Sequence, residues 1–134
     1  MAGVFSKIVS GEFSAYKVAE NDEFLAFLDI NPVAIGHVLV IPKKETDYIF
    51  DLESDEYQAL WMFARKVASG LKQAVSCKRI GISVIGLEVP HAHIHLVPMN
   101  SMGDINFSKT KLNPTREELE LVCEKIKTHI NMIS

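Results

Sequence analysis

The sequence predicts an α+β protein, and three features of it support that prediction. Short apolar segments between residues 14 and 42 and between residues 79 and 98 are bounded by Gly, Pro, Asn or Asp, as β-strands usually are. Two longer segments, in the middle and at the end of the chain, carry apolar residues at intervals of three and four, as amphipathic helices do. The expected order is a hairpin, a third strand, a long helix, two strands and a helix, which is an α+β arrangement. A chain of 134 residues without repeats or linkers is expected to form a single domain over residues 1–134.

A short helix and three strands are expected in the first part of the chain. Residues 5–9 hold apolar side chains at helical spacing and are followed by Ser-Gly, which ends a helical turn. Residues 14–20 and 23–30 are predicted to form the two strands of a hairpin. After a loop over residues 31–36, residues 37–42 are apolar on both faces, which predicts a central strand buried on two sides.

Two helices and the remaining strands are expected in the second part. Apolar residues form one broad stripe over residues 57–75, and Ser54 is the expected N-cap of this helix. Residues 79–89 have strand character but carry two glycines, which indicate a bulge or a close approach of the backbone to another group. Thr115 and Glu118 have the spacing of a capping box, so the last helix is expected to begin there.

Composition and charge exclude several classes of function. The formal net charge is −3 and the pI is about 5.9, so no basic surface for nucleic acid is expected. The apolar runs are too short to span a bilayer, and no secretory signal is visible. Cys77 and Cys123 lie outside any CxxC pattern and are expected to be ordinary core or half-exposed thiols. The sequence therefore indicates a soluble cytoplasmic protein without nucleic-acid or membrane partners.

The stretch HAHIHLVP, residues 91–98, holds three of the five histidines at alternate positions. Side chains alternate between the two faces of a strand, so His91, His93 and His95 are expected to share one face. A single histidine in a strand usually lies at the surface or is hydrogen-bonded in the core. Burying three of them without a function would carry the cost of desolvation three times. Two functional alternatives are a metal site and a nucleophilic site.

These two alternatives place different demands on geometry. Zinc lies about 2.0–2.1 Å from imidazole nitrogen, whereas strand positions four apart are separated by roughly 13 Å. All three imidazoles cannot easily reach one ion, and Asp29 and His37 are the further candidate ligands. In a nucleophilic site, a neutral imidazole attacks phosphorus while its neighbours orient it and donate protons. The middle residue, His93, is then the expected nucleophile.

The sequence resembles the histidine triad (HIT) family of nucleotide hydrolases and transferases. The family signature, His-x-His-x-His followed by two apolar residues, is matched at residues 91–97. Residues 23–44 are similar to the family's sequence of strand, Asp-containing turn, small-residue loop, histidine and Pro-Lys, and FSKIVSGE resembles its opening. The resemblance implies a five-stranded antiparallel sheet with a long central helix, a short N-terminal helix and a C-terminal helix. It also implies a homodimer that needs no metal or other cofactor for its chemistry.

The resemblance further implies roles for individual residues. His93 would attack the α-phosphate of an AMP-like purine nucleotide, a nucleoside phosphoramidate or a dinucleoside polyphosphate, and form a nucleotidyl-histidine intermediate. His91 and His95 would contact phosphate oxygens or position the His93 ring. Asp29 would accept hydrogen bonds from the ribose, and His37 would lie beside the triad in a structural or catalytic role. The other residues expected at the nucleotide are Phe5, Ile8, Phe27 and Ile30 in an apolar base pocket, and Glu88 and Val89 just before the triad.

Three departures from the family pattern bear on these roles. Many bacterial members hold a structural zinc with Cys-x-x-Cys and histidines, but Gly3, Ser6 and Glu45 stand at three of those positions, so no structural zinc is expected. Leu87 replaces the family's glutamine before the triad, and its upstream asparagine is replaced in the segment that contains residues 80–81. These changes leave the triad intact. A rival hypothesis is a nucleotide-binding or partner-binding module with little turnover.

Overall fold

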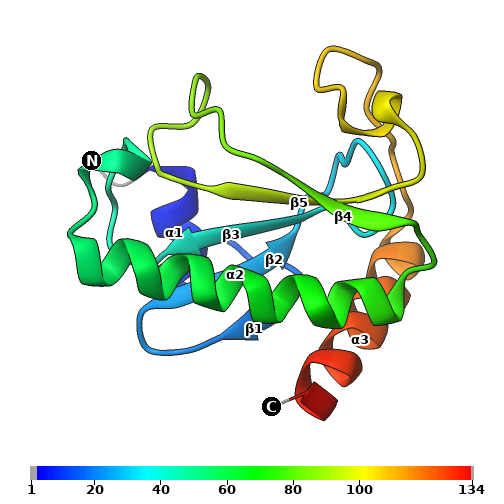
Figure 1. The fold of residues 1–134 in the computed structure, drawn as a ribbon, viewed down its shortest axis with the longest axis horizontal. Coiled ribbons are helices and arrows are strands. Elements are labelled where there is room, and N and C mark those ends of the chain that lie inside the picture. Colours follow the sequence, from blue (N-terminus) through cyan, green and yellow to red (C-terminus); the bar gives the residue numbers. More distant parts are fainter. Residues whose placement is uncertain (1–2, 134) are drawn as a thin grey trace.

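The computed structural model describes residues 3–133. Within them the chain forms a five-stranded antiparallel sheet in the order β1-β2-β3-β5-β4 (Figure 1). This arrangement confirms the predicted α+β fold. The helices are α1 (Val4–Ser10), α2 (Ser54–Ala74) and α3 (Arg116–Ile133), with 3-10 turns η1 (Ile49–Asp51) and η2 (Met102–Ile105). The strands are β1 (Lys17–Glu20), β2 (Phe24–Leu28), β3 (Val38–Pro42), β4 (Arg79–Ser83) and β5 (Ile94–Met99).

The predicted hairpin and central strand are confirmed, with slightly shorter bounds. β2 and β3 pair along their whole length, and every residue of both strands is buried, as expected for a strand near residues 37–42. Asn21 closes the turn between β1 and β2, because its Oδ1 accepts hydrogen bonds from the backbone N–H groups of Glu23 and Phe24 at 2.9 and 2.8 Å.

The strand prediction for residues 79–89 is wrong beyond Ser83. The chain leaves the sheet there and crosses to the histidines as an irregular segment. Gly86 lies in this segment with φ of +74°, a left-handed conformation that a strand does not contain and that glycine adopts readily. The next strand begins at Ile94, so the first two triad histidines precede the strand rather than lie in it.

The helix ends agree with the sequence in two places and differ in one. α1 ends at Gly11, which has φ of +87° as a left-handed C-cap. The capping box before α3 is confirmed: Thr115 Oγ1 accepts the Glu118 N–H at 3.1 Å, and Glu118 Oε1 accepts the Thr115 N–H at 3.4 Å. The prediction of Ser54 as the N-cap of α2 is wrong, because the helix already includes Ser54. Glu53 takes the cap position without a side-chain hydrogen bond.

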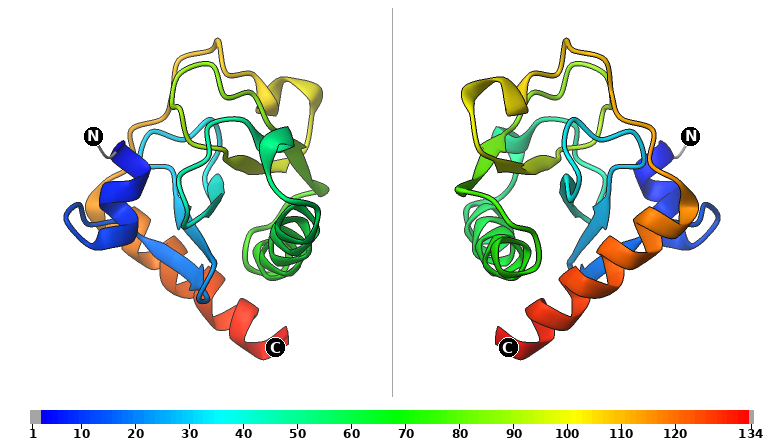
Figure 2. Two further views of the ribbon diagram at one scale, coloured as in Figure 1. Left: turned by 90° about the vertical axis from the view of Figure 1, so that its left-hand side faces the viewer. Right: turned by 90° about the vertical axis from the view of Figure 1, so that its right-hand side faces the viewer.

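Different helices cover the two faces of the sheet, and Figure 2 shows α1 and α2 on opposite sides of it. α2 and α3 pack on one face and build the larger apolar core, which includes Ile94 and Leu96 of β5. α1 packs on the other face through Phe5 and Ile8. Since side chains alternate along a strand, His95 between Ile94 and Leu96 faces the α1 side. This side of the sheet carries the site described below.

Both cysteines are free thiols, Cys77 half-buried and Cys123 buried, as expected from their spacing. The Cys123 thiol donates a hydrogen bond to the Lys17 carbonyl at 3.3 Å and so joins α3 to β1. No helix within residues 3–133 has both the length and the apolar character needed to cross a membrane.

Candidate active site

Four buried histidines form one row on the α1 side of the sheet. The ring centroids of His93 and His95 are 4.8 Å apart, and those of His95 and His37 are 5.2 Å apart. Phe5 of α1 packs edge-on against His91 at 5.7 Å and His93 at 5.2 Å, so it links the first two triad rings. The triad thus lies together on one side of the sheet, with His37 at its end, although only His95 belongs to a strand.

Backbone carbonyls determine the tautomers of the first two triad imidazoles. His93 Nδ1 lies 2.7 Å from the carbonyl oxygen of His91. A carbonyl can only accept, so in the neutral ring Nδ1 carries the proton and Nε2 keeps its lone pair. His91 Nε2 donates to the Pro42 carbonyl at 2.8 Å, and its buried Nδ1 has no partner within residues 3–133. His93 therefore presents the unprotonated nitrogen that nucleophilic attack requires.

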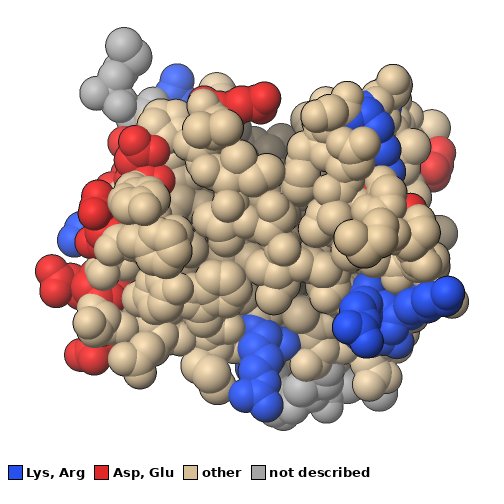
Figure 3. Space-filling view, turned by 45° about the horizontal axis from the view of Figure 1, so that its top comes forward, with Lys and Arg blue, Asp and Glu red and all other residues tan. Residues whose placement is uncertain are grey.

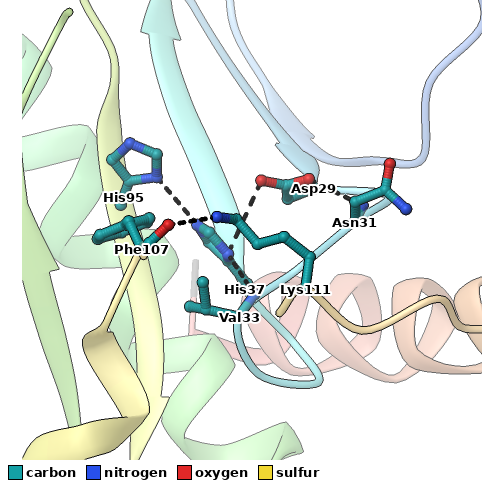
Figure 4. A network of polar contacts seen from close by, with 7 residues as sticks. All are labelled: Asp29, Asn31, Val33, His37, His95, Phe107 and Lys111. Atoms are coloured by element: carbon teal, nitrogen blue, oxygen red, sulfur yellow. Dashed lines mark hydrogen bonds and ion pairs between the residues drawn. The ribbon is translucent and has the colours of Figure 1, made fainter. Parts of the chain in front are cut away.

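A second chain of hydrogen bonds runs through His37 and His95 (Figure 4). The backbone N–H of Val33 donates to His37 Nδ1 at 3.2 Å, which places the proton of this ring on Nε2. His37 Nε2 then donates to His95 Nδ1 at 2.9 Å. The proton of His95 is consequently on Nε2, and this ring presents an N–H donor.

Burial keeps the imidazoles of His37, His91 and His95 neutral. Removal from water is the main cause that lowers the pKa of His37 to about 3 and that of His95 to about 4. Burial also lowers the pKa of His91. His37 Nδ1 lies 3.8 Å from Asp29 Oδ2, but a neutral ring whose Nδ1 accepts the Val33 N–H does not form an ion pair with it.

Asp29 lies beside His37 and keeps acceptor capacity for a ligand. Its Oδ1 accepts the backbone N–H of Asn31 at 2.9 Å. The side chain is 24% exposed, and burial raises the pKa of its carboxyl group above the ordinary value. An ionised carboxylate has about four acceptor positions, so Asp29 can still bind hydroxyl groups such as those of a ribose.

The residues predicted for the base pocket do not all lie together. Phe5, Ile8 and Phe27 are buried in one apolar cluster beside the triad, and Val89 packs against it. Ile30 lies outside this cluster, with 57% of its surface exposed. Glu88, also predicted to contact the nucleotide, is exposed in the irregular segment before the triad. A cavity of about 350 Å³ borders His93, between η1, α2 and this segment.

Gly3, Ser6 and Glu45, which stand where other family members have zinc ligands, are joined by hydrogen bonds. Glu45 Oε1 accepts the Gly3 N–H at 2.9 Å and the Ser6 hydroxyl at 2.7 Å. These bonds, that from Ser6 first, lower the pKa of Glu45. They hold the start of α1 to the segment after β3. Within residues 3–133, no three His, Cys, Asp or Glu side chains are grouped to hold a metal ion.

Two residues at the site were not predicted from the sequence. The Phe107 ring lies 4.6 Å from the His95 ring and 5.8 Å from the His37 ring. Lys111 Nζ donates to the Phe107 carbonyl at 2.6 Å (Figure 4). Both residues belong to the segment between η2 and α3, which has no periodic pattern that could have marked them.

The fold and the row of imidazoles together are those of a histidine triad protein. The family model named HIT domain matches residues 10–102, and the chain belongs to this family.

An uncharacterized HIT-like protein of Borreliella burgdorferi is 33% identical over 135 residues, which cover 95% of this chain and 97% of the relative. The adenosine 5′-monophosphoramidase HNT1 of Saccharomyces cerevisiae is 32% identical over 98 residues, 72% of this chain and 62% of that protein. A zinc-bound histidine triad family protein of Mycobacterium smegmatis has the same fold, with a TM-score of 0.85, 26% identity and coverage of 99% and 96% of the two chains. Family membership supports a nucleotide hydrolase or transferase.

Proposed function

We propose that the protein is a metal-independent hydrolase or nucleotidyl transferase acting at the α-phosphate of a purine nucleotide. The observation that carries this proposal is the hydrogen bond from His93 Nδ1 to the His91 carbonyl, which leaves Nε2 as the nucleophile. The similarity to a monophosphoramidase favours a nucleoside phosphoramidate as the substrate. A dinucleoside polyphosphate is the alternative within the same reaction class.

The reaction divides into two displacements at phosphorus. Nε2 of His93 attacks the α-phosphorus, and the bond to the leaving group breaks while that group takes up a proton from solvent. The N–H of His95 donates to a phosphate oxygen, because the hydrogen bond from His37 holds His95 in the required tautomer. Fixed donors in a site shielded from water stabilise the charge that develops on these oxygens. Water then attacks the nucleotidyl-histidine, which releases the mononucleotide, returns a proton to solvent and restores His93.

The nucleoside occupies the α1 side of the sheet in this proposal. Asp29 accepts hydrogen bonds from the ribose hydroxyl groups, and the base lies against the apolar cluster that contains Phe5. His91 acts as a positioning residue, because its ring bonds the Pro42 carbonyl while its own carbonyl holds the His93 proton. The remaining proposed contacts with the nucleotide are those of Ile8, Phe27, Ile30, Glu88 and Val89.

Intact-protein mass spectrometry after mixing with adenosine 5′-phosphoramidate tests this function. We expect a transient AMP adduct and a turnover that EDTA does not change. The adduct should be absent from His93→Ala and present in His129→Ala, a matched substitution of a half-buried histidine in α3, far from the triad in the sequence. Saturable AMP binding by the unmodified protein without adduct or turnover would contradict the proposal and favour a binding module.

We also propose that two copies pair along the free edge of β4. The strand order leaves β4 at an edge of the sheet, and Ile82 on it is 52% exposed. Val84 and Ile85, which follow β4, are also exposed, and Figure 3 shows an uncharged area in the middle of this side, between acidic side chains and basic ones. An exposed apolar edge strand is a template for pairing, and a two-fold axis would satisfy both copies alike.

Light scattering after gel filtration tests the dimer. The protein should have about twice the chain mass of 15.0 kDa, and Ile82→Lys should have the mass of one chain. Leu121→Lys, a matched change at an exposed leucine of α3, should leave the dimer intact. A single-chain mass for the unmodified protein would refute the pairing.

A further inference from the structure

We infer that Lys111 is a phosphate-binding residue of this site, brought there by the segment between η2 and α3. The inference rests on the proposed function and extends it, because it names a specificity-determining cation outside the triad and its flanking residues. Five observations lead to it: the anchoring of the segment, the position of the ammonium group, its spare N–H donors, the neutrality of the histidines and the loss of polar groups elsewhere.

The segment is anchored on both sides of Lys111. On one side, the Phe107 ring packs against the rings of His95 and His37. On the other side, the Leu112 backbone N–H donates to the Pro32 carbonyl at 2.9 Å, which joins the segment to the loop before β3. Lys111 is therefore held at a defined place beside the triad rather than on a free tail.

The ammonium group of Lys111 lies between the proposed nucleophilic end of the site and the proposed ribose end. Figure 4 shows the side chain reaching across His37, between His95 and Asp29. Its charge acts on both of these residues as well as on His37. A nucleotide whose ribose is bound at Asp29 and whose α-phosphate is bound at the triad would pass next to this ammonium group.

Lys111 also has hydrogen-bonding capacity to spare. An ammonium group carries three N–H donors, and the Phe107 carbonyl accepts one of them. The side chain is exposed, so the other donors can turn toward an incoming anion without displacing a core contact. Hydrogen bonds between an ammonium group and phosphate oxygens are charge-assisted and stronger than neutral ones.

The rest of the site gives a nucleotide phosphate little positive charge. His37, His91 and His95 are neutral, and Asp29 is a carboxylate that repels an anion. Leu87, at the position of the family's glutamine, is 88% exposed and apolar. The segment before the triad therefore provides no attraction for phosphate. Lys111, from a distant part of the chain, supplies it.

Calorimetric titration with AMP and with adenosine tests the inference, because the two ligands differ only by the phosphate. Lys111→Gln should weaken AMP binding about tenfold, the effect of one charge-assisted hydrogen bond at an exposed position. It should leave adenosine binding unchanged and make AMP binding less sensitive to salt. Lys111→Arg should keep most of the AMP affinity. Lys109→Gln is the matched control, because Lys109 Nζ contacts the Gly103 carbonyl of η2 at 3.4 Å instead, and it should behave as the unmodified protein.

The possible outcomes separate this inference from the proposed function. Equal loss of AMP and adenosine affinity in Lys111→Gln would mean that Lys111 only tethers the segment, and would overturn the inference. Unchanged AMP affinity in Lys111→Gln, when the unmodified protein forms the AMP adduct, would also overturn the inference. The proposed function would then remain in place. An unmodified protein that binds neither ligand would overturn both.

Discussion

Acidification should destabilise this protein through two buried histidines. His37 and His95 have folded pKa values of about 3 and about 4, against 6.5 for the exposed side chain. Between those values the unfolded chain binds more protons than the folded protein, so stability falls as the pH falls. The stabilising contribution is complete above pH 6.5 and is lost progressively as the pH approaches 4 for His95 and 3 for His37.

The size of the effect follows from the same values. At about pH 5 an unfolded histidine is almost fully protonated and either buried ring is almost fully neutral, which amounts to about 2 kcal/mol for each residue. Together they should lower the free energy of unfolding by about 4 kcal/mol relative to about pH 7.5, a large part of the 5–15 kcal/mol typical of a domain. Hydrogen bonds also lower the pKa values of Glu20 and Asp104, but their ordinary values of 4.5 and 3.8 place those losses at lower pH.

Urea unfolding at several pH values and one protein concentration measures this loss, with Trp61 as the single tryptophan probe. His37→Gln removes one of the two rings with the largest pKa shifts, so about 2 kcal/mol of the pH dependence should disappear, while His91, whose pKa burial also lowers, adds to the dependence of both proteins. His129→Gln removes a histidine of α3 with an exposed hydrogen bond and should keep the full dependence. A loss smaller than about 1 kcal/mol in the unmodified protein at about pH 5 would refute the reasoning, because either ring alone accounts for more.

Two further predictions concern α1 and α3. Glu45→Ala should raise KM for the nucleotide with little change in kcat, because the hydrogen bonds of Glu45 hold α1 and with it Phe5 against the triad. Lys44→Ala is the neighbouring control, and an unchanged KM in Glu45→Ala would show that α1 is held by packing alone. Thr115→Ala should lower the free energy of unfolding by about 1 kcal/mol through loss of the capping box, with kcat unchanged. Urea unfolding at neutral pH checks the stability, and equal stability of the two proteins would show that the cap contributes nothing.

The features that the sequence predicted correctly depend on residues close together in the chain. The capping box at Thr115 and Glu118 needs only a spacing of three, and the side that His95 faces follows from strand alternation. The prediction of a strand that holds all three triad histidines was wrong for His91 and His93, which precede β5. The same kind of local reasoning was wrong for Ser54, because a serine before a helical stripe can also be its first residue. Local reasoning was also wrong beyond Ser83. The residues that follow are apolar, as in a strand, but the chain leaves the sheet there.

The features that could not be predicted depend on contacts between distant parts of the chain. Glu45 forms hydrogen bonds with Gly3 and Ser6, which lie 42 and 39 positions away in the sequence. From the sequence, Glu45 indicated only that a zinc ligand is absent and not that it forms these bonds. Phe107 and Lys111 come from a segment with no periodicity. Only the folded chain packs Phe107 against His95 and brings the charge of Lys111 near enough to act on Asp29. The exposure of Ile30, which a family pattern assigns to the base pocket, is likewise visible only in the structure.

Three chemically identical imidazoles acquire different functions here because each has a different hydrogen-bond partner. A carbonyl acceptor holds the proton of His93 on Nδ1. At His95, by contrast, a donor faces Nδ1 and the proton of that ring is on Nε2. The donor at His95 is itself determined one step earlier, by the backbone N–H of Val33 at His37. Reversing either assignment would leave two donors or two acceptors facing each other in a site from which water is largely excluded, at the cost of an unsatisfied buried group. In the proposed reaction, the difference between the nucleophile and the hydrogen-bond donor is therefore set by the backbone around the triad, while the repeated histidine supplies only the chemical groups.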